Sequence, residues 1–272
     1  VAADGTHKAS FTPGMELRAK YTLFAEGCRG QLSKQLINKF ALNYGKDPQH
    51  YGIGIKELWE IPAEQSQPGL VIHTAGWPLS ESKTVGGGFL YHTHDNKVAL
   101  GLITDLGYQN PFVSPFDEFQ RWKLQRSIRV HLEGGKRLGY GARAITKGGL
   151  QSLPKMTFPG GLLIGCAAGT LNYAKIKGNH TAMKSGMLAA ETVHQALQAG
   201  RQHDELLEFT QQFNDSWIHT ELHQQRNFGA YMHKFGTIGG AAAAFVDLNL
   251  LNGKAPFTLQ NPVADHNALK PA

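Results

Sequence analysis

The sequence predicts an α/β fold, of the α+β kind, in which a mainly antiparallel β-sheet interrupts an α/β unit. The first indication is a pair of strand–loop–helix patterns, around Gly27 and around Gly165, that lie far apart along the chain. The second is the stretch of residues 51–107, where four short apolar runs alternate with Pro, Gly and Ser clusters. We therefore expect residues 1–44 and 141–255 to form the α/β unit, residues 45–140 the inserted sheet, and residues 256–272 a tail.

The composition is that of a globular protein and argues against a nucleic-acid partner. The 272 residues are 41% apolar and 18% charged, which is ordinary for a chain long enough to bury a sizeable core. The formal net charge is +6, but Lys and Arg are scattered, so we expect no nucleic acid to bind. Two cysteines, Cys28 and Cys166, are too few for a disulfide framework or a four-thiolate iron–sulfur cluster, and a reducing intracellular setting is the simplest interpretation.

The first strand–loop–helix unit occupies residues 15–40. Apolar residues alternate from residue 15 and run into Glu26-Gly27, which predicts a strand over residues 15–26. Directly behind Gly30, helical spacing predicts a helix with the apolar residues Leu32, Leu36, Ile37 and Phe40. A strand, a glycine-containing turn and a helix in this order present backbone N–H groups to a ligand.

The inserted sheet is predicted from four runs, residues 52–59, 70–73, 89–92 and 98–103, with a turn at Asp95-Asn96 between the last two. The three consecutive glycines at 86–88 are expected to precede the third strand. A helix should follow the sheet, with Ser114 as its N-cap and Pro115 at its first position. Its apolar face is expected to consist of Phe116, Phe119 and Trp122.

The second strand–loop–helix unit begins with a short buried strand over residues 161–166. A helix is predicted over residues 181–197, with an apolar face of Met183, Met187, Ala190 and Val193. Another is predicted over residues 203–219, with Leu206, Phe209, Phe213 and Trp217 on one side. The last apolar segment, residues 235–251, is too short to span a bilayer. It fits either a core helix or an interfacial helix with a face of Ala241, Ala244, Phe245, Leu248 and Leu251.

The two glycine loops together favour a dinucleotide-binding protein, because such ligands sit where loops return to one edge of an α/β sheet. Either loop alone is better explained by a tight turn in an unrelated fold. No G-x-G-x-x-G follows a strand and opens a helix in this sequence. We therefore expect no residue of this sequence to hold a dinucleotide pyrophosphate.

Longer motifs carry a resemblance to a known family. The most distinctive is the run KIKGNHTAMKSG, from Lys175 to Gly186. Six shorter runs accompany it: Phe24–Gly30, Gly52–Trp59, Gly76–Leu79, Gly87–His92, Asp105–Pro111 and Glu118–Lys123. With these motifs the chain resembles the electron transfer flavoprotein–ubiquinone oxidoreductases from Phe11 to Lys270. The family's opening dinucleotide loop and its cysteine-rich iron–sulfur domain have no counterpart, so we expect an internal fragment of a longer protein.

The resemblance implies a fold and an activity. The α/β unit would be part of a Rossmann-like FAD-binding domain, and the inserted sheet a ubiquinone-binding domain. Electrons would enter from reduced electron transfer flavoprotein and leave on ubiquinone in the respiratory chain. FAD and a [4Fe–4S] cluster would be the relays, the cluster not being ligated by this chain. The family is monotopic, which implies a mitochondrial inner membrane (matrix face) or a bacterial cytoplasmic membrane.

The resemblance also assigns residues to the flavin site. Ala25, Glu26 and Gly27 match the loop that runs along the FAD. Gly165 heads the later loop, where many flavoproteins of this type place Gly-Asp to bind the ribityl chain. Cys166 stands where that Asp would be, so this sequence lacks the usual carboxylate hydrogen bond to the ribityl hydroxyls.

A helix start and a glycine pair complete the assigned residues. The helix that begins at Gly178, Asn179, His180 and Thr181 would face the flavin N1–C2=O edge with its N-terminus. The partial positive charge of that N-terminus would stabilise the anionic reduced ring. Asn179 and Thr181 are also good N-caps, and both roles are compatible. Gly86 and Gly87 match the positions whose backbone meets the quinone head group, where the missing Cβ permits close approach. From the residues alone, a β-bulge or turn explains this pair better.

Neither a metal site nor an acid–base site is expected. His92 and His94 are two apart on one predicted strand and share a face, and His180 lies elsewhere, but no third ligand accompanies the pair. No catalytic residues are assigned, because cofactors carry the chemistry in an enzyme of this kind.

Two other functions remain open. A flavoprotein reductase of the prenyl-reductase type lacks the iron–sulfur domain naturally, although the motifs at Gly86-Gly87 and at Tyr108–Pro111 speak against it. A non-catalytic quinone-binding or interaction module is the alternative from another class. Without the first βαβ unit, this piece alone is expected to have exposed sheet edges and to aggregate.

Overall fold

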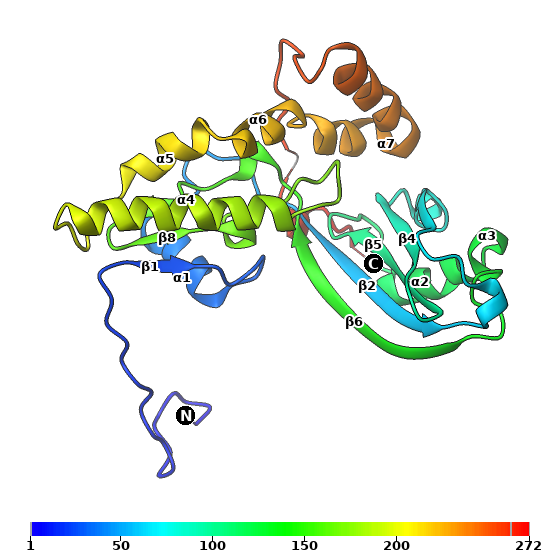
Figure 1. Ribbon diagram of the computed structural model, residues 1–272, viewed down its shortest axis with the longest axis horizontal. Helices are drawn as coiled ribbons and strands as arrows, with labels where there is room; N and C mark the ends of the chain where they lie inside the picture. The colour runs from blue at the N-terminus through cyan, green and yellow to red at the C-terminus, as the bar shows by residue number, and fades with distance from the viewer. Residues whose placement is uncertain (1, 262, 272) are drawn as a thin grey trace.

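The computed structural model describes residues 2–261 and 263–271. A small three-stranded sheet with helices around it lies beside a larger five-stranded sheet that curves away from it (Figure 1). The predicted mixed α/β fold with an antiparallel sheet between its two α/β segments is confirmed.

The three-stranded sheet joins the two predicted strand–loop–helix units. Strand β1 (Thr22–Phe24) pairs in parallel with β8 (Gly161–Leu163), and β7 (Thr157–Phe158) pairs antiparallel with β8. Helix α1 (Gln31–Lys39) follows β1, and α4 (Asn179–Gln198) follows β8. Because β1 and β8 are parallel neighbours, the loops behind them leave the sheet at the same edge.

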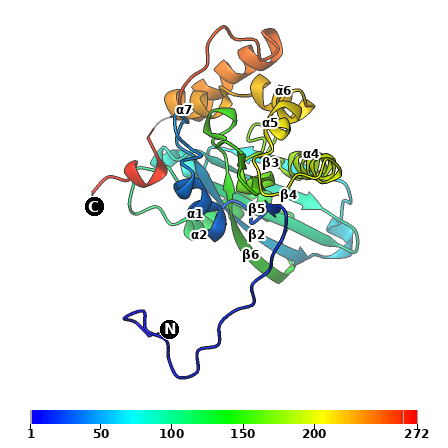
Figure 2. The ribbon, with the colours of Figure 1, turned by 90° about the vertical axis from the view of Figure 1, so that its left-hand side faces the viewer.

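Strand β1 is much shorter than the predicted strand over residues 15–26. Its first register pair is Thr22 with Gly161, and no strand among the described residues pairs with residues 15–20. Met15 and Leu17 are 92% and 90% exposed, so the alternation there buries nothing. In both views the segment before β1 extends away from the rest of the protein (Figures 1 and 2).

The five-stranded sheet has the order β3–β4–β5–β2–β6 and is antiparallel throughout. Its strands are β2 (Tyr51–Glu60), β3 (Val71–Ala75), β4 (Gly86–His92), β5 (Lys97–Asp105) and β6 (Lys136–Thr146). All four predicted strands are present, and Asp95 and Asn96 form the predicted turn with φ of 58° and 54°. Strand β6 was missed because Gly139 and Gly141 interrupt its apolar pattern.

The glycine run 86–88 lies within β4 and not before it, which corrects the prediction. A Cβ at Gly88 would lie 2.4 Å from the Trp122 ring, a contact that real Cβ atoms do not make. Trp122 belongs to α2, is fully buried and donates through Nε1 to Thr74 Oγ1 at 2.8 Å. Glycine therefore allows the strand to approach the helix that covers it.

The other helices are α2 (Pro115–Lys123), α3 (Arg126–Arg129), α5 (Leu207–Asn214), α6 (Trp217–Gln224) and α7 (Phe228–Phe245). Short 3₁₀ helices occur at Ala63–Gln65, Leu79–Ser82, Leu150–Ser152, Gly165–Ala167 and Asp265–Asn267, and a π-helix at Val246–Leu250. The predicted start of α2 is confirmed, since Asp117 N donates to Ser114 Oγ at 3.3 Å. Phe119 and Trp122 are buried as expected, but Phe116 is 55% exposed.

Helix α4 buries a different face from the one predicted. Met183 and Met187 are 70% and 54% exposed. The buried residues are smaller or polar on average: Thr181, Ser185, Leu188, Ala189, Thr192 and Ala196. Small side chains let the helix approach the turn at Gly165, whose N–H donates to Ser185 Oγ at 2.9 Å. Hydrophobicity alone therefore selected the wrong side of a correctly predicted helix.

The predicted helix over residues 203–219 is two helices, α5 and α6. Ser216 has extended backbone angles and its hydroxyl donates to the Phe213 carbonyl at 2.6 Å, which separates them. Phe213 is buried as predicted, whereas Trp217 is 44% exposed, because the break turns it away from the core.

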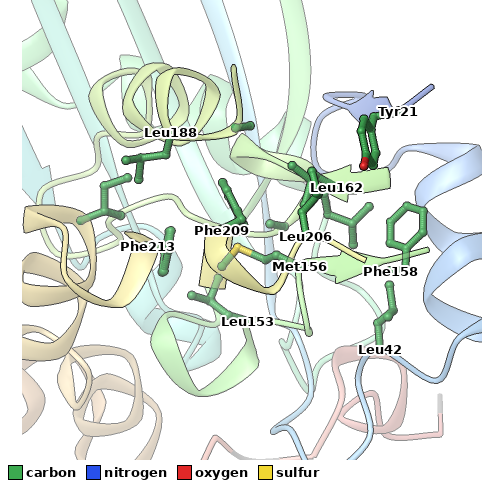
Figure 3. Packing of buried hydrophobic residues seen from close by; sticks show 14 of the residues in the cluster. Tyr21, Leu42, Leu153, Met156, Phe158, Leu162, Leu188, Leu206, Phe209 and Phe213 are labelled. Carbon is green, nitrogen blue, oxygen red and sulfur yellow. The ribbon is translucent and has the colours of Figure 1, made fainter. Parts of the chain in front are cut away.

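Two apolar cores correspond to the two sheets. The first fills the space between the small sheet, α4 and α5, with Leu162, Leu188, Phe209 and Phe213 at its centre (Figure 3). The second lies between the large sheet and α2, and includes Leu90, Leu100 and Trp122. Strand β2 begins, and β6 ends, where the two parts meet, with Tyr51 and Thr146 as register partners.

Candidate functional site

The two predicted glycine loops come together at one cavity. Phe24 and Leu163 are register partners, so the loops after β1 and β8 begin side by side. A cavity of about 300 Å³ lies between them and α1. Gly27, Cys28, Ser33, Cys166 and Gly169 are among its lining residues. We call it the loop cavity.

Glu26 contacts α1. Its Oε2 accepts hydrogen bonds from Ser33 N at 2.6 Å and Ser33 Oγ at 2.7 Å, and Leu32 N donates to Oε1 at 3.3 Å. The Ser33 hydroxyl holds the pKa of the Glu26 carboxyl below its usual value. Of the predicted residues in this loop, Gly27 lines the cavity and has a φ of 81°, whereas Ala25 and Glu26 lie outside the lining.

Gly165 forms the turn against the first part of α4. Its φ is 56°, and a Cβ there would be 3.2 Å from the Ala182 Cβ. Cys166, the next residue, lines the loop cavity, and burial raises the pKa of its thiol. Cys28 lies on the opposite loop and donates to the Ala144 carbonyl at 2.8 Å. Both thiols are therefore brought to one cavity from distant parts of the sequence.

The four residues predicted at the start of α4 lie at its N-terminus but outside the lining of the loop cavity. Neither Asn179 nor Thr181 caps the helix with its side chain, so the predicted N-cap role is wrong for both. Thr181 is buried, and its Oγ1 donates to the Gly178 carbonyl at 2.9 Å. The His180 ring stacks on Trp217 with centroids 5.6 Å apart, and its Nε2 lies 2.8 Å from Glu221 Oε1. The His180 side chain thus joins α4 to α6.

A second cavity, of about 160 Å³, contains the predicted glycine pair. We call it the glycine cavity. Gly86 and Gly87 line one wall from β4, the segment Leu171–Ile176 lines another, and Phe228 and Met232 of α7 close it. A Cβ at Gly86 would be 2.3 Å from the Ile103 carbonyl oxygen, and one at Gly87 would be 2.4 Å from that of Thr74. Close strand packing therefore requires both glycines, and both line the cavity.

Buried polar groups stand in the wall of the glycine cavity, and no sequence pattern predicted them. Lys147 follows β6, and its Nζ is paired with Asp105 Oδ2 and lies 3.1 Å from His233 Nε2. Nζ also lies 4.7 Å from the centre of the Tyr173 ring. Burial disfavours the charged lysine, but Tyr173 and Asp105 favour it, and the net effect raises the pKa of Lys147.

His92 and His94 do not share a strand face, which corrects that prediction. His92 is buried and its Nε2 lies 3.1 Å from His131 Nδ1, whereas His94 lies in the turn after β4 and is exposed. Within residues 2–261 and 263–271, no group of three or more His, Cys, Asp or Glu side chains could hold a metal ion.

Helix α7 and the π-helix after it carry a group of exposed apolar side chains. Gly236, with φ 68° and ψ −173°, kinks α7, and the outer arm, residues 237–251, stands apart from the sheets (Figures 1 and 2). The exposed apolar residues are Phe235, Ile238 and Phe245 of α7, followed by Val246, Leu250 and Leu251. Ala244 is buried and Leu248 half-buried, so the predicted face is only partly correct. No helix of the described chain is long and apolar enough to cross a bilayer.

Comparison with solved structures identifies the fold. The fold matches a geranylgeranyl bacteriochlorophyll reductase-like protein from Thermoplasma acidophilum with a TM-score of 0.62, at 16% identity, over 92% of this chain and 58% of that one. It matches a flavin-dependent brominase with a TM-score of 0.53, at 16% identity, over 87% of this chain and 55% of that one. The chain thus shares the fold of these two proteins, a mixed α/β architecture with an antiparallel sheet.

Comparison with known sequences confirms the resemblance. Residues 51–145 match the family described as ETF-QO, ubiquinone-binding. The chain is 61% identical to the electron transfer flavoprotein-ubiquinone oxidoreductase of Pseudomonas aeruginosa over 96% of its own length and 48% of that protein's. It is 50% identical to the mitochondrial human protein of that name over 100% and 45% of the two lengths. The chain is therefore homologous over nearly its whole length to electron transfer flavoprotein-ubiquinone oxidoreductases, and spans about half the length of these relatives.

Proposed function

We propose that this chain is part of an enzyme that passes electrons from reduced electron transfer flavoprotein to ubiquinone in a respiratory chain. The observation that carries the proposal is the glycine cavity, and the similarity of the chain to the named oxidoreductases supports it. It is mainly apolar, two glycines expose backbone in one wall, and a few polar groups stand in the other. A quinone head group, which is flat and has two carbonyl oxygens, fits these features.

The loop cavity fits the flavin end of an FAD molecule. Gly27 and the backbone after Gly165 face it from two parallel strands, the place where such ligands bind in α/β sheets. FAD would supply the capacity to accept electrons from a protein donor and release them to a quinone. Ala25 and Glu26 would hold the loop beside it, and the N-terminus of α4, residues 178–181, would favour negative charge on the reduced ring.

The proposed iron–sulfur cluster has no ligand set in this chain. A cluster of this kind needs four thiolates, and the sequence has two cysteines, Cys28 and Cys166. Both line the loop cavity, where no further cysteine can join them. We therefore assign the cluster to other residues of the complete protein and derive no step through it.

Membrane attachment would be monotopic and would use the outer arm of α7. Ile238 is 87% exposed and Phe245 60%, and apolar side chains of this size gain free energy when they enter the headgroup boundary. The membrane would be the mitochondrial inner membrane, on its matrix face, or a bacterial cytoplasmic membrane. The glycine cavity is lined by Met232 and Thr237 of the same helix, so a lipid-dissolved quinone would have a short path to it.

The test uses the complete purified protein and a short-chain ubiquinone. Anaerobic addition of reduced electron transfer flavoprotein should reduce the quinone, and the variant Ala174→Phe should slow this by filling the glycine cavity. Ala142→Phe on exposed strand β6 is the matched control and should have no effect. Retained quinone binding without flavin would favour a binding module instead. Reduction of prenyl double bonds without oxidation of the flavoprotein would favour the prenyl-reductase class.

A further inference from the structure

Three polar side chains form a continuous contact through the wall of the glycine cavity. Lys147 and Asp105 are an ion pair with side-chain exposures of 2% and 4%. His233 Nε2 lies 3.1 Å from Lys147 Nζ and 3.3 Å from Asp105 Oδ2. They come from the segment after β6, the end of β5 and the inner arm of α7. Lysine is almost never buried to this extent without a specific partner.

The three residues connect two different cavities. Lys147 lines the glycine cavity, and Asp105 lines both that cavity and a broad polar groove on its other side. His233 lines the groove, which has a volume of about 840 Å³ and also contains Lys83 and Asn110. A group in the glycine cavity is therefore linked to the groove through Lys147 and His233, with Asp105 between the two cavities.

Burial and the neighbouring charges leave His233 neutral. Burial and the charge of Lys147 outweigh the opposing charges of Asp105 and Asp265, and together they lower the pKa of His233 to about 4. His50 lies behind it, with ring centroids 5.0 Å apart, and is itself held by Asp265 Oδ1 at 2.6 Å. The phenol of Tyr173 faces Lys147 from the opposite side. A neutral imidazole can take up a proton at Nδ1 while it releases one from Nε2.

We propose that Lys147, Asp105 and His233 form a proton relay that supplies a quinone reduced in the glycine cavity. The inference rests on the proposed function and adds to it the source of the protons. Lys147 would donate to the quinone carbonyl oxygen on its side. His233 would return a proton to the lysine from the groove. Asp105 would hold both groups in position and keep the lysine charged between turnovers.

The step balances with the electrons that the proposed activity supplies. Reduction of one quinone consumes two electrons, from reduced electron transfer flavoprotein, and two protons. The N–H bond of the Lys147 ammonium breaks and an O–H bond forms on one quinone oxygen. The neutral amine then takes the proton from His233 Nε2 as Nδ1 gains one from water in the groove. The second quinone oxygen takes its proton from bulk water. The products are quinol, charged Lys147 and His233 protonated at Nδ1, and proton exchange with groove water returns the imidazole proton to Nε2 before the next turnover.

The position of the ion pair favours this role over a purely structural one. A buried ion pair contributes little to stability compared with apolar side chains of similar volume. A pair placed only for packing would need neither a third, neutral group nor contact with two cavities. Glu57 of β2, with Lys123 of α2 and Arg137 of β6, forms such a structural cluster, and it lines none of the four cavities.

The first test is His233→Phe in the complete purified enzyme, because it removes the groove end of the relay without leaving a buried charge unpaired. Quinol formation should fall about tenfold or more. The rate of the variant should also fall about tenfold for each unit of rising pH between pH 6 and 8, whereas the rate of the wild type stays nearly constant. Added imidazole should restore part of the rate. The solvent deuterium effect should rise. His131→Phe replaces another half-buried histidine with a lowered pKa; it is the matched control and should change none of these.

Two further measurements separate the relay from the proposed function. Reduction of ferricenium, which takes electrons without protons, and equilibrium binding of a ubiquinone analogue should both be unchanged in His233→Phe. The neutral double variant Lys147→Met with Asp105→Asn should bind the analogue but form quinol roughly 100-fold more slowly. Full quinol formation with a flat pH profile in both variants would overturn the relay and leave the proposed function intact. A wild type that reduces ferricenium but not ubiquinone would overturn the proposed function.

Discussion

At the scale of single residues, the glycines of β4 give the sharpest packing prediction. A methyl group at Gly88 would overlap Trp122, which cannot move away without losing its hydrogen bond to Thr74. Gly88→Ala should lower the free energy of unfolding by about 1–3 kcal/mol, as overpacking of a core does. Urea unfolding followed by tryptophan fluorescence measures it.

The matched control for Gly88→Ala is Gly139→Ala on β6. No atom outside its immediate neighbours lies within 4 Å of a Cβ at Gly139. That substitution should change the free energy of unfolding by less than about 0.5 kcal/mol. Equal effects of the two substitutions would show that the close contact between β4 and α2 is not what makes Gly88 necessary.

Glu221 provides a pH-dependent prediction. Burial raises the pKa of this carboxyl, but hydrogen bonds from Lys175, His180 and Asn172 outweigh it and lower the pKa to about 2 from 4.5. A lowered folded-state pKa stabilises the protein fully above pH 4.5, and this contribution is lost as pH falls toward 2. Glu221→Gln should therefore lower stability by about 1–3 kcal/mol at pH 7, with the difference shrinking below pH 4.5.

Urea unfolding of both proteins at pH 7 and near pH 3 measures the effect of Glu221→Gln. The control is Glu191→Gln on the exposed side of α4, which should change little at either pH. A difference at pH 3 as large as that at pH 7 would contradict the assigned hydrogen bonds.

The sequence predicts a residue well when its role depends on its own backbone conformation, and poorly when its role depends on tertiary contacts. Gly27 and Gly165 were found because glycine after a strand is a local signal, and both have positive φ. Lys147, Asp105 and His233 were missed, because they are 42 and 86 positions apart and lie on three elements. Glu26, which we expect along the FAD, accepts a hydrogen bond from Ser33, a contact that no spacing rule indicates.

At the scale of elements, periodicity located helices but did not orient them. Helix α4 begins at Asn179 and ends at Gln198, close to the predicted 181–197, yet its buried face was wrong. Its exposed methionines are the larger apolar residues, whereas Ser185 and Ala189 fit against the Gly165 turn and α5. The kink at Gly236 and the break at Ser216 each depend on one residue's backbone angles, which the apolar pattern does not report.

The outer arm of α7 gives a prediction about membrane binding. Ile238→Glu and Phe245→Glu replace exposed apolar side chains with charges. Because burying such a side chain is worth about 1.5–3 kcal/mol, each should lower the vesicle partition coefficient of the complete protein about tenfold or more. Flotation with vesicles of phosphatidylcholine and cardiolipin measures it.

Leu207→Glu is the matched control for α7. Leu207 is 61% exposed, but it lies on α5, away from the outer arm. Its substitution should leave vesicle binding unchanged. If all three variants bind equally, the exposed face of α7 has another role, and membrane attachment must use other residues.

At the scale of the whole molecule, the insertion was predictable because each part has a different apolar pattern. Alternation with short turns marked the large sheet, and helical periods marked the remainder. The meeting of the parts was not predictable, since it depends on β2 and β6, whose ends bring Tyr51 to the loop cavity and place Lys147 beside the glycine cavity. The two candidate ligand sites are close because Thr146 lines the loop cavity while its neighbours Ile145 and Lys147 line the glycine cavity.

Two cores that share few residues should lose stability separately, and this is a prediction for the whole molecule. Phe213→Ala removes a fully buried ring from the first core, and Leu100→Ala removes a fully buried side chain from the second. Each should lower stability by about 2–5 kcal/mol. Because local opening follows contiguous cooperative units, amide exchange should rise in α4 and α5 for Phe213→Ala and in β4 and β5 for Leu100→Ala. Hydrogen-exchange mass spectrometry measures both. Equal loss of protection in all four elements would mean that β2 and β6 couple the sheets into one cooperative unit, and the two ligand sites would then open together.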